Sequence, residues 1–236
     1  MAWRHRWFYK GFMMVMGVFL LAPLLVVAGV SLNARKQLLF PPEGYSLRWY
    51  DELLTSAEWL VPVKNSLIIA ASSGLVALSV ALPLAYFLWR HRVVYARVLL
   101  SLGIAPFILP PVITALGFLI FWTASGVYGL MPTVILSHGI FFTTLPLVTL
   151  SLGFESIPPE VIEAAETMGA NQRTIFLTVL LPMVVPYIIS GYLFTFVLSL
   201  NEYIVAYMVA GFTVETLPIK IFNSLRYGYT PVMAAV

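Results

Sequence analysis

The chain has 236 residues, of which 61% are hydrophobic and 10% are charged, with a net charge of +3 and a mean hydropathy of +0.94. A soluble domain of this size carries far more charge, so the composition indicates a membrane protein. The absence of cysteine excludes disulfides, thiolate metal sites and cysteine nucleophiles. The Lys and Arg residues flank apolar segments without forming a basic run, and we therefore expect no nucleic-acid partner.

Five segments are apolar and long enough to cross a membrane, because about 20 helical residues span ~30 Å of hydrocarbon. They cover residues 11–32, 64–89, 98–122, 132–153 and 183–208. The first follows Arg4, Arg6 and Lys10, but it is about twice as long as the apolar region of a signal peptide, so we interpret it as a retained helix. We expect a sixth helix to begin near Tyr229 and to be cut short where the sequence ends.

These segments predict an all-α membrane protein of about six helices, the last truncated, in one transmembrane domain over residues 1–236. Its expected parts are a first helix (1–32), an external segment with an interfacial helix at 46–60 (33–63), core helices (64–208) with a loop at 154–182, an external loop (209–228) and the start of a sixth helix (229–236). Lys and Arg in short flanks stay on the cytoplasmic side. They place the N-terminus, the 90–97 loop and the 154–182 loop in the cytoplasm.

The third span is irregular because it carries Pro106, Pro110 and Pro111. Each proline removes a backbone donor and bends or breaks a helix. A single proline in a membrane helix often serves packing alone, whereas three within six residues favour a helix that lines a moving pathway.

The cytoplasmic loop contains the most informative pattern of the chain. Pro159 suits the first turn of a helix, and Glu160 and Glu163 near its start complement the helix dipole. Apolar residues recur at helical spacing and predict one apolar face. That face consists of Val161, Ala164, Ala165 and Met168. Gly169 then supplies a left-handed cap, and Asn171 can cap a second helix that runs towards Pro182.

A helix of this kind lies parallel to the membrane and passes directly into the last complete span. Lipid headgroups would favour Lys and Arg on its polar face and bulky anchors on the other. The glutamates and alanines present instead favour a protein partner, with the small alanines leaving room for the partner's cleft. An amphipathic connector that rests on lipid is the alternative.

The loop resembles the EAA loop of binding-protein-dependent ABC importer permeases. Glu163-Ala164-Ala165, then Gly169, then Val179-x-Leu181-Pro182 match the family pattern EAA-x3-G-x9-I-x-LP, with valine in place of isoleucine. In that family the loop is the coupling helix, which docks into a groove of the ATPase subunit. The resemblance implies that the following residues contact the ATPase: Glu160, Glu163, Ala164, Ala165, Met168, Gly169 and Arg173.

Residues 41–54, the Ser137-His138 pair and residues 198–225 also resemble the permeases of the spermidine/putrescine importer group. The resemblance implies a type I importer permease in a bacterial inner membrane. The implied partners are a second, related permease in a heterodimer, two ATPase subunits and an external solute-binding protein. The chain has no phosphate-binding loop, so ATP and Mg are expected on the ATPase subunits and no catalytic role or cofactor is expected here.

Glu202 is the main candidate for the solute pathway, because a carboxylate at membrane depth is costly and usually faces a cavity or a partner. Asn201 and Tyr203 flank it, and His138 is a second candidate. The alternatives are a carboxylate at a helix end, or one paired with the other permease, and a histidine that hydrogen-bonds across helices. Polyamine permeases typically have two adjacent acids where this chain has Asn201-Glu202, so the solute is either a polyamine or another small solute such as an aminophosphonate.

A secondary transporter that works without an ATPase is the alternative of a different class. It would require coupling-ion sites and usually internal repeats, and the sequence shows neither. A membrane sensor or scaffold that uses the loop to dock a signalling partner is a third class.

Overall fold

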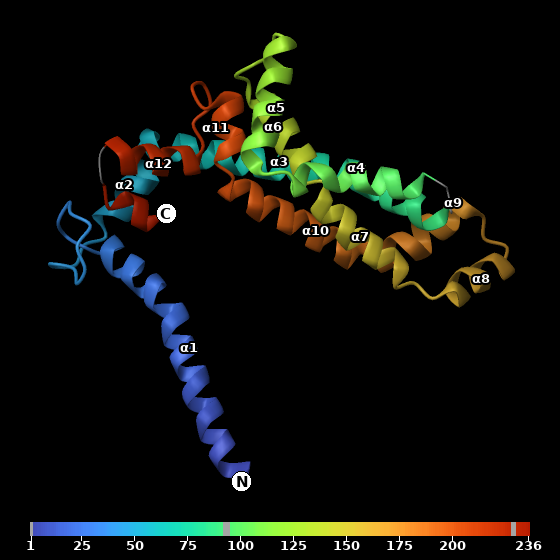
Figure 1. The fold of residues 1–236 in the computed structure, drawn as a ribbon, viewed down its shortest axis with the longest axis horizontal. Helices are drawn as coiled ribbons and strands as arrows, with labels where there is room; N and C mark the ends of the chain where they lie inside the picture. The colour runs from blue at the N-terminus through green and yellow to red at the C-terminus, as the bar shows by residue number, and fades with distance from the viewer. Residues whose placement is uncertain (1, 92–94, 228–229) are drawn as a thin grey trace. The chain divides into compact units, whose positions relative to one another are not determined.

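The computed structural model describes residues 2–91, 95–227 and 230–236, with side chains apart from those of residues 2–6, 96, 97 and 227. The arginines at positions 4, 6, 92 and 97 and the predicted helix start at Tyr229 therefore lie outside the description. The described residues are almost entirely helical (Figure 1), and the one extended pairing among them is an isolated bridge between Asn33 and Tyr45. Two compact units are present, one formed by residues up to Val61 with Lys220–Val236 and the other by Pro62–Ile219.

The first unit contains three helices and the beginning and end of two more. Its complete helices are α1 (Ala2–Ser31), α2 (Arg48–Thr55) and α13 (Val232–Ala235). Trp49 is buried, and its indole N–H donates to the Asn33 carbonyl at 2.6 Å, which fixes the segment that follows α1. The membrane-length part of α1 is only 6% buried, so nearly all of its apolar side chains are uncovered within this chain.

The helix predicted over residues 46–60 is in fact two helices. The chain is extended at Ser56, where α2 has ended and α3 (Ala57–Arg90) begins. The Ser56 hydroxyl accepts the Glu58 N–H at 3.3 Å, which is the capping role that serine favours at a helix start. Trp59 therefore belongs to α3 rather than to the interfacial helix.

The second unit holds the remaining helices. These are most of α3, then α4 (Ala96–Ile108), α5 (Pro111–Ala124), α6 (Met131–Phe141), α7 (Thr144–Glu155), α8 (Pro159–Thr167), α9 (Gln172–Ile175), the π-helical turn η1 (Phe176–Leu180), α10 (Leu181–Asn201), α11 (Ile204–Ala210) and the start of α12 (Leu217–Tyr227). Figure 1 shows α8 at one end of this unit and α5 and α11 at the other.

Three helices of the described chain are long and apolar enough to span a membrane, and the number reaches five when each bent pair counts as one span. Several predicted spans are broken rather than continuous. The span at 98–122 is α4 and α5, which meet at 102° because Leu109 and Pro110, each preceding a proline, are extended. The span at 132–153 is α6 and α7, bent by 42°, and the one at 183–208 is interrupted before α11.

The segment predicted as an external loop over residues 209–228 contains a helix, α12, in its second half. This helix is short and amphipathic, and a search for long apolar segments does not detect such an element. Its Lys220 forms an ion pair with Glu58 at the start of α3.

Two hydrophobic clusters stabilise the second unit. One joins α3, α5, α6 and α11 and includes Ile69, Phe141 and Val205. The other joins α3, α7 and α10 to the loop that carries α8, and includes Phe154, Ala165 and Val184. The α8 segment is therefore packed onto the membrane helices by the second cluster.

Glycine permits the close contact between α7 and α10. A Cβ atom on Gly191 would lie 2.7 Å from the Pro146 Cα, a backbone atom that cannot rotate away. Small residues at such contacts are typical of membrane helices, where backbones approach closely.

We expect Gly191→Ala to destabilise the protein by about 1–3 kcal/mol, because the added methyl group overpacks this contact. Thermal unfolding of the purified permease in detergent measures the effect. Gly117→Ala is the matched control, since nothing lies within 4 Å of its Cβ position. Equal melting temperatures for the two variants would contradict the packing argument.

Candidate functional site

The α8 helix is closed at both ends by local backbone chemistry. Pro159 occupies its first turn, where a missing N–H costs nothing. At the other end the Gly169 N–H donates to the Glu166 carbonyl at 2.9 Å, and the Ala170 N–H donates to the Ala165 carbonyl at 3.1 Å. This pair of bonds is the Schellman arrangement, and Gly169 takes the positive φ (+83°) that it requires. The predicted left-handed cap is confirmed.

The buried face of α8 is not the apolar face that the sequence predicted. Ala165 is only 4% exposed and packs into the cluster with Ile162 partly buried beside it, whereas Met168 is 81% exposed. The reason is that Ile162 and Ala165, three residues apart, share the face that meets the membrane helices. Ala165 thus anchors the helix to its own chain. Of the residues assigned to the ATPase contact, those left exposed are Glu160, Glu163, Ala164, Met168, Gly169 and Arg173.

A continuous backbone path connects α8 to the long helix α10. The Asn171 side chain accepts the Thr174 N–H at 2.9 Å and caps α9, as predicted. The π-helical turn η1 follows, and Pro182 lies in the first turn of α10. Proline cannot donate to the carbonyl four residues earlier, and a widened turn just before it accommodates that missing bond.

A side-chain bridge that the sequence did not indicate links the same region to α3. The Gln172 amide N–H donates to Glu166 on α8 at 3.0 Å, and its carbonyl oxygen accepts from Arg90 at the end of α3 at 3.2 Å. An exposed glutamine carries no pattern in a single sequence, so this link was not predictable.

Glu202 lies at the opposite end of α10, in the break that precedes α11. Its carboxylate accepts the backbone N–H groups of Ile204, Val205 and Ala206 at 2.9–3.1 Å. The side chain is 8% exposed. It therefore caps the first turn of α11, where free N–H groups favour negative charge.

His138 on α6 lies behind this carboxylate and is 1% exposed. Its Nδ1 shares a hydrogen bond with the Ser199 hydroxyl at 2.8 Å, which confirms a hydrogen bond across helices. Its Nε2 is 3.2 Å from the Glu202 carboxylate, but the contact is not aligned as a hydrogen bond, so this buried nitrogen has no hydrogen-bond partner. The neighbouring Ser137 hydroxyl accepts the Trp122 indole N–H at 2.8 Å.

An open recess of about 550 Å³ adjoins the break. It is lined mainly by aromatic and aliphatic side chains, with Glu202 supplying a carboxylate. The lining residues are Phe107, Pro111, Phe141, Phe142, Leu198, Asn201, Glu202, Tyr203 and Ile204. The structure thus brings Asn201, Glu202 and Tyr203 together at one surface, and His138 is not part of the lining.

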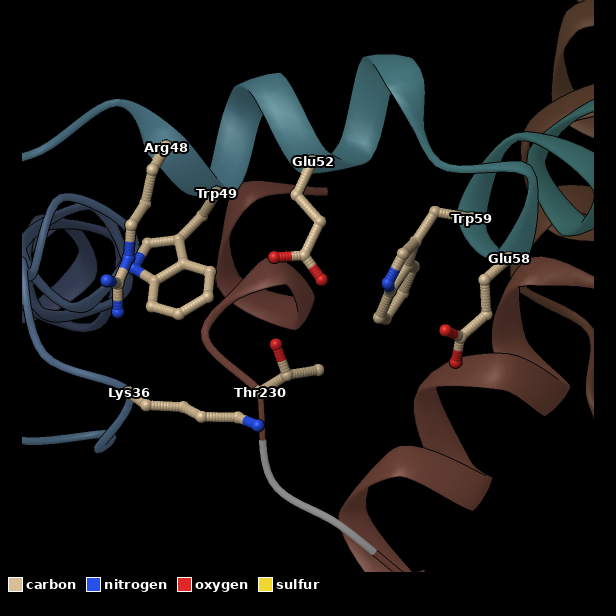
Figure 2. A pocket seen from close by; sticks show the side chains of 7 residues that line it. All are labelled: Lys36, Arg48, Trp49, Glu52, Glu58, Trp59 and Thr230. Atoms are coloured by element: carbon tan, nitrogen blue, oxygen red, sulfur yellow. The ribbon is translucent and has the colours of Figure 1, made fainter.

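A second pocket, of about 470 Å³, lies wholly in the first unit (Figure 2). The Glu52 carboxylate lies between the Trp49 and Trp59 rings, with Lys36 and Arg48 on one side. The Arg48 guanidinium is 3.9 Å from the centroid of the Trp49 ring. Among the described residues, no group of His, Asp or Glu side chains is arranged to hold a metal ion.

A membrane bundle with broken helices and an exposed, Gly-capped EAA helix that leads into a span defines the transmembrane subunit of an ABC importer. The family model of the binding-protein-dependent transport system inner membrane component matches residues 75–236. The chain belongs to this family and is a permease subunit of a binding-protein-dependent importer.

Curated relatives place it near the polyamine permeases. The chain is 34% identical to the putrescine transport system permease protein PotI of Escherichia coli K12, over 92% of this chain and 80% of PotI. It is 28% identical to the spermidine/putrescine permease PotC of Haemophilus influenzae, over 96% and 88% of the two chains. The fold matches a bacterial ABC transporter for alginate import with a TM-score of 0.73 at 18% identity, over 97% and 89%.

We expect Gly169→Val to distort the loop after α8, because a side chain at this positive φ costs on the order of 1–2 kcal/mol. ATP hydrolysis stimulated by loaded solute-binding protein should fall, while membrane insertion is retained. Gly126→Val is the matched control, since Gly126 also has a positive φ (+71°) and open space around its Cβ position but lies outside the loop. Normal stimulation in Gly169→Val would contradict the coupling role.

Proposed function

We propose that this permease forms half of the pathway for a small organic cation, with a di- or polyamine as the first candidate. The observation that carries the proposal is the recess beside the α10–α11 break, where the Glu202 carboxylate adjoins aromatic rings. Phe107, Phe141 and Phe142 form a set of rings with centroids 4.9–6.4 Å apart. Aromatic faces and a carboxylate both attract ammonium groups. The printed names of PotI and PotC support an amine.

Another small solute, such as an aminophosphonate, is the second candidate. Asn201 gives the recess one charge fewer than two adjacent acids would, which suits a ligand with less positive charge. Titration of the external solute-binding protein with amines, aminophosphonates and amino acids distinguishes the two candidates.

In the proposed mechanism, α8 lies on the cytoplasmic side with the N-terminus, and an ATPase subunit grips its exposed face. Two such ATPase subunits bind ATP and Mg, while this chain is non-catalytic and binds no cofactor. Movement of α8 passes through Gly169, α9 and η1 into α10. The carboxylate at the far end of α10 then moves with the helix, and the recess alternates in its accessibility.

The remaining partners follow from surfaces that this chain leaves uncovered. The apolar side chains of α1 contact lipid and a second, related permease. This second permease completes a heterodimer in a bacterial inner membrane. The external solute-binding protein meets the first unit, where the pocket of Figure 2 offers charges of both signs. The alginate transporter has been crystallised with its periplasmic binding protein, which supports the same kind of partner here.

We expect the full chain to co-purify with an ATPase whose turnover rises when loaded solute-binding protein is added. The physical reason is that the exposed face of α8 does not contribute to the folding of this chain and can therefore bind a partner. Purification from native membranes followed by an ATPase assay measures this. Uptake that continues without any ATPase would instead favour a secondary transporter, and a co-purified signalling protein would favour a sensor.

We expect Glu202→Gln to raise the apparent KM for putrescine uptake, because the recess loses its negative charge. The same change also weakens the cap of α11 by about 1 kcal/mol. Asn201→Asp separates the two effects, since it adds charge to the recess and leaves the Glu202 cap intact. It should lower the KM about fivefold, as one added charge at about 4 Å contributes ~1 kcal/mol in water. Unchanged kinetics in both variants would leave Glu202 with a structural role alone.

A further inference from the structure

A side chain from a third helix contacts both the end of α10 and the break that precedes α11. His138 is fully buried on α6, and its ring reaches both sides of the break. One nitrogen is hydrogen-bonded to Ser199 in the last turn of α10, at 2.8 Å, and the other is 3.2 Å from the Glu202 carboxylate. Two helix ends that are joined by only two residues thus share one anchor.

The surroundings of His138 are well packed. The ring meets Phe142 edge-on, with centroids 5.9 Å apart, and the neighbouring Ser137 is fixed by the Trp122 indole of α5. On the other side of Glu202, α11 packs into the cluster of α3, α5 and α6 through Val205 and Val209. The anchor therefore connects the end of α10 to a well-packed part of the protein.

We infer that His138 is a positioning residue. It keeps the Glu202 carboxylate on the backbone N–H groups at the start of α11 and so holds the ends of α10 and α11 together, which we call the closed state of the break. The Nε2 contact with Glu202 at 3.2 Å is not aligned as a hydrogen bond, and such a contact costs less to release than a full hydrogen bond. When α10 moves, release of this nitrogen frees Glu202 towards the recess. This last step rests on the proposed function, whereas the anchor itself does not.

The absence of natural cysteine allows a direct test. Val205→Cys places a thiol at a position that is 0% exposed, and a buried thiol reacts slowly with N-ethylmaleimide. In the full chain in its native membrane, the labelling rate of this cysteine reports how often the break opens.

Substitutions at His138 separate its two contacts. His138→Asn can still reach Ser199 but not Glu202, and it should raise the labelling rate about tenfold. His138→Gln places an amide where Nε2 lies, keeps the contact with Glu202 and gives up the one with Ser199, so it should raise the rate less than His138→Asn does. Ser199→Ala removes the α10 side of the anchor and should also raise the rate, which tests the inference if His138→Asn does not insert.

Ser73→Ala is the control for general loosening. It removes a different buried hydrogen bond to α6, from the Ser73 hydroxyl to the Ile135 carbonyl at 3.1 Å. The rate should not change. The inference is overturned if His138→Asn and Ser199→Ala both keep the labelling rate of the parent. It is also overturned if Ser73→Ala raises the rate as much as His138→Asn does. A rate in His138→Gln as high as in His138→Asn would overturn it too.

A measurement in the assembled transporter connects the anchor to the cycle. Trapping the ATPase with ADP and vanadate should change the Val205→Cys labelling rate in the parent but leave it constant in His138→Asn, where the break is already open. If the parent does not respond while the order of the variants holds, the proposed movement of α10 in the transport cycle fails and the anchor stands. If the parent responds and His138→Asn responds equally, the anchoring role fails alone.

Discussion

A helix that begins inside a membrane leaves backbone N–H groups that lipid cannot satisfy, and this constraint governs the start of α11, just after α10 ends. The Glu202 carboxylate satisfies three of them at the start of α11. The interruption is therefore stable without water, although it costs the burial of a charged group. A protein that needed only a rigid span would have continued the helix. The break with its buried acid is the feature around which the recess and His138 are arranged.

The other end of α10 is continuous with the loop before it, because η1 and α9 join it to the segment that carries α8. Ala165 is buried against the membrane helices, and the neighbouring Ala164 and Met168 remain outside. One short helix thus presents one face to its own chain and leaves another exposed. The tight cap at Gly169 and the short α9 leave little slack between that helix and α10.

The sequence was informative where local chemistry alone determines the backbone. The start of α8 at Pro159, the cap at Gly169 and the cap at Asn171 all followed from residue type and position. The EAA pattern also led to the family, and its Gly169 has a local role in the cap. The apolar face of α8 could not be predicted, because the choice between Ala164 and Ala165 depends on which side meets the membrane helices.

Long-range contacts and helix breaks were harder to predict from the sequence. Hydropathy cannot distinguish one bent span from two helices, as the 102° angle between α4 and α5 shows, although the prolines at 110 and 111 indicated where it would fall. The contact between His138 and Glu202 joins positions 64 residues apart, and neither residue carries a local signal for the other. Glu202 was expected either to face a cavity or to lie at a helix end. The fold makes both true, because a helix break inside a membrane protein produces a terminus and a recess at the same place.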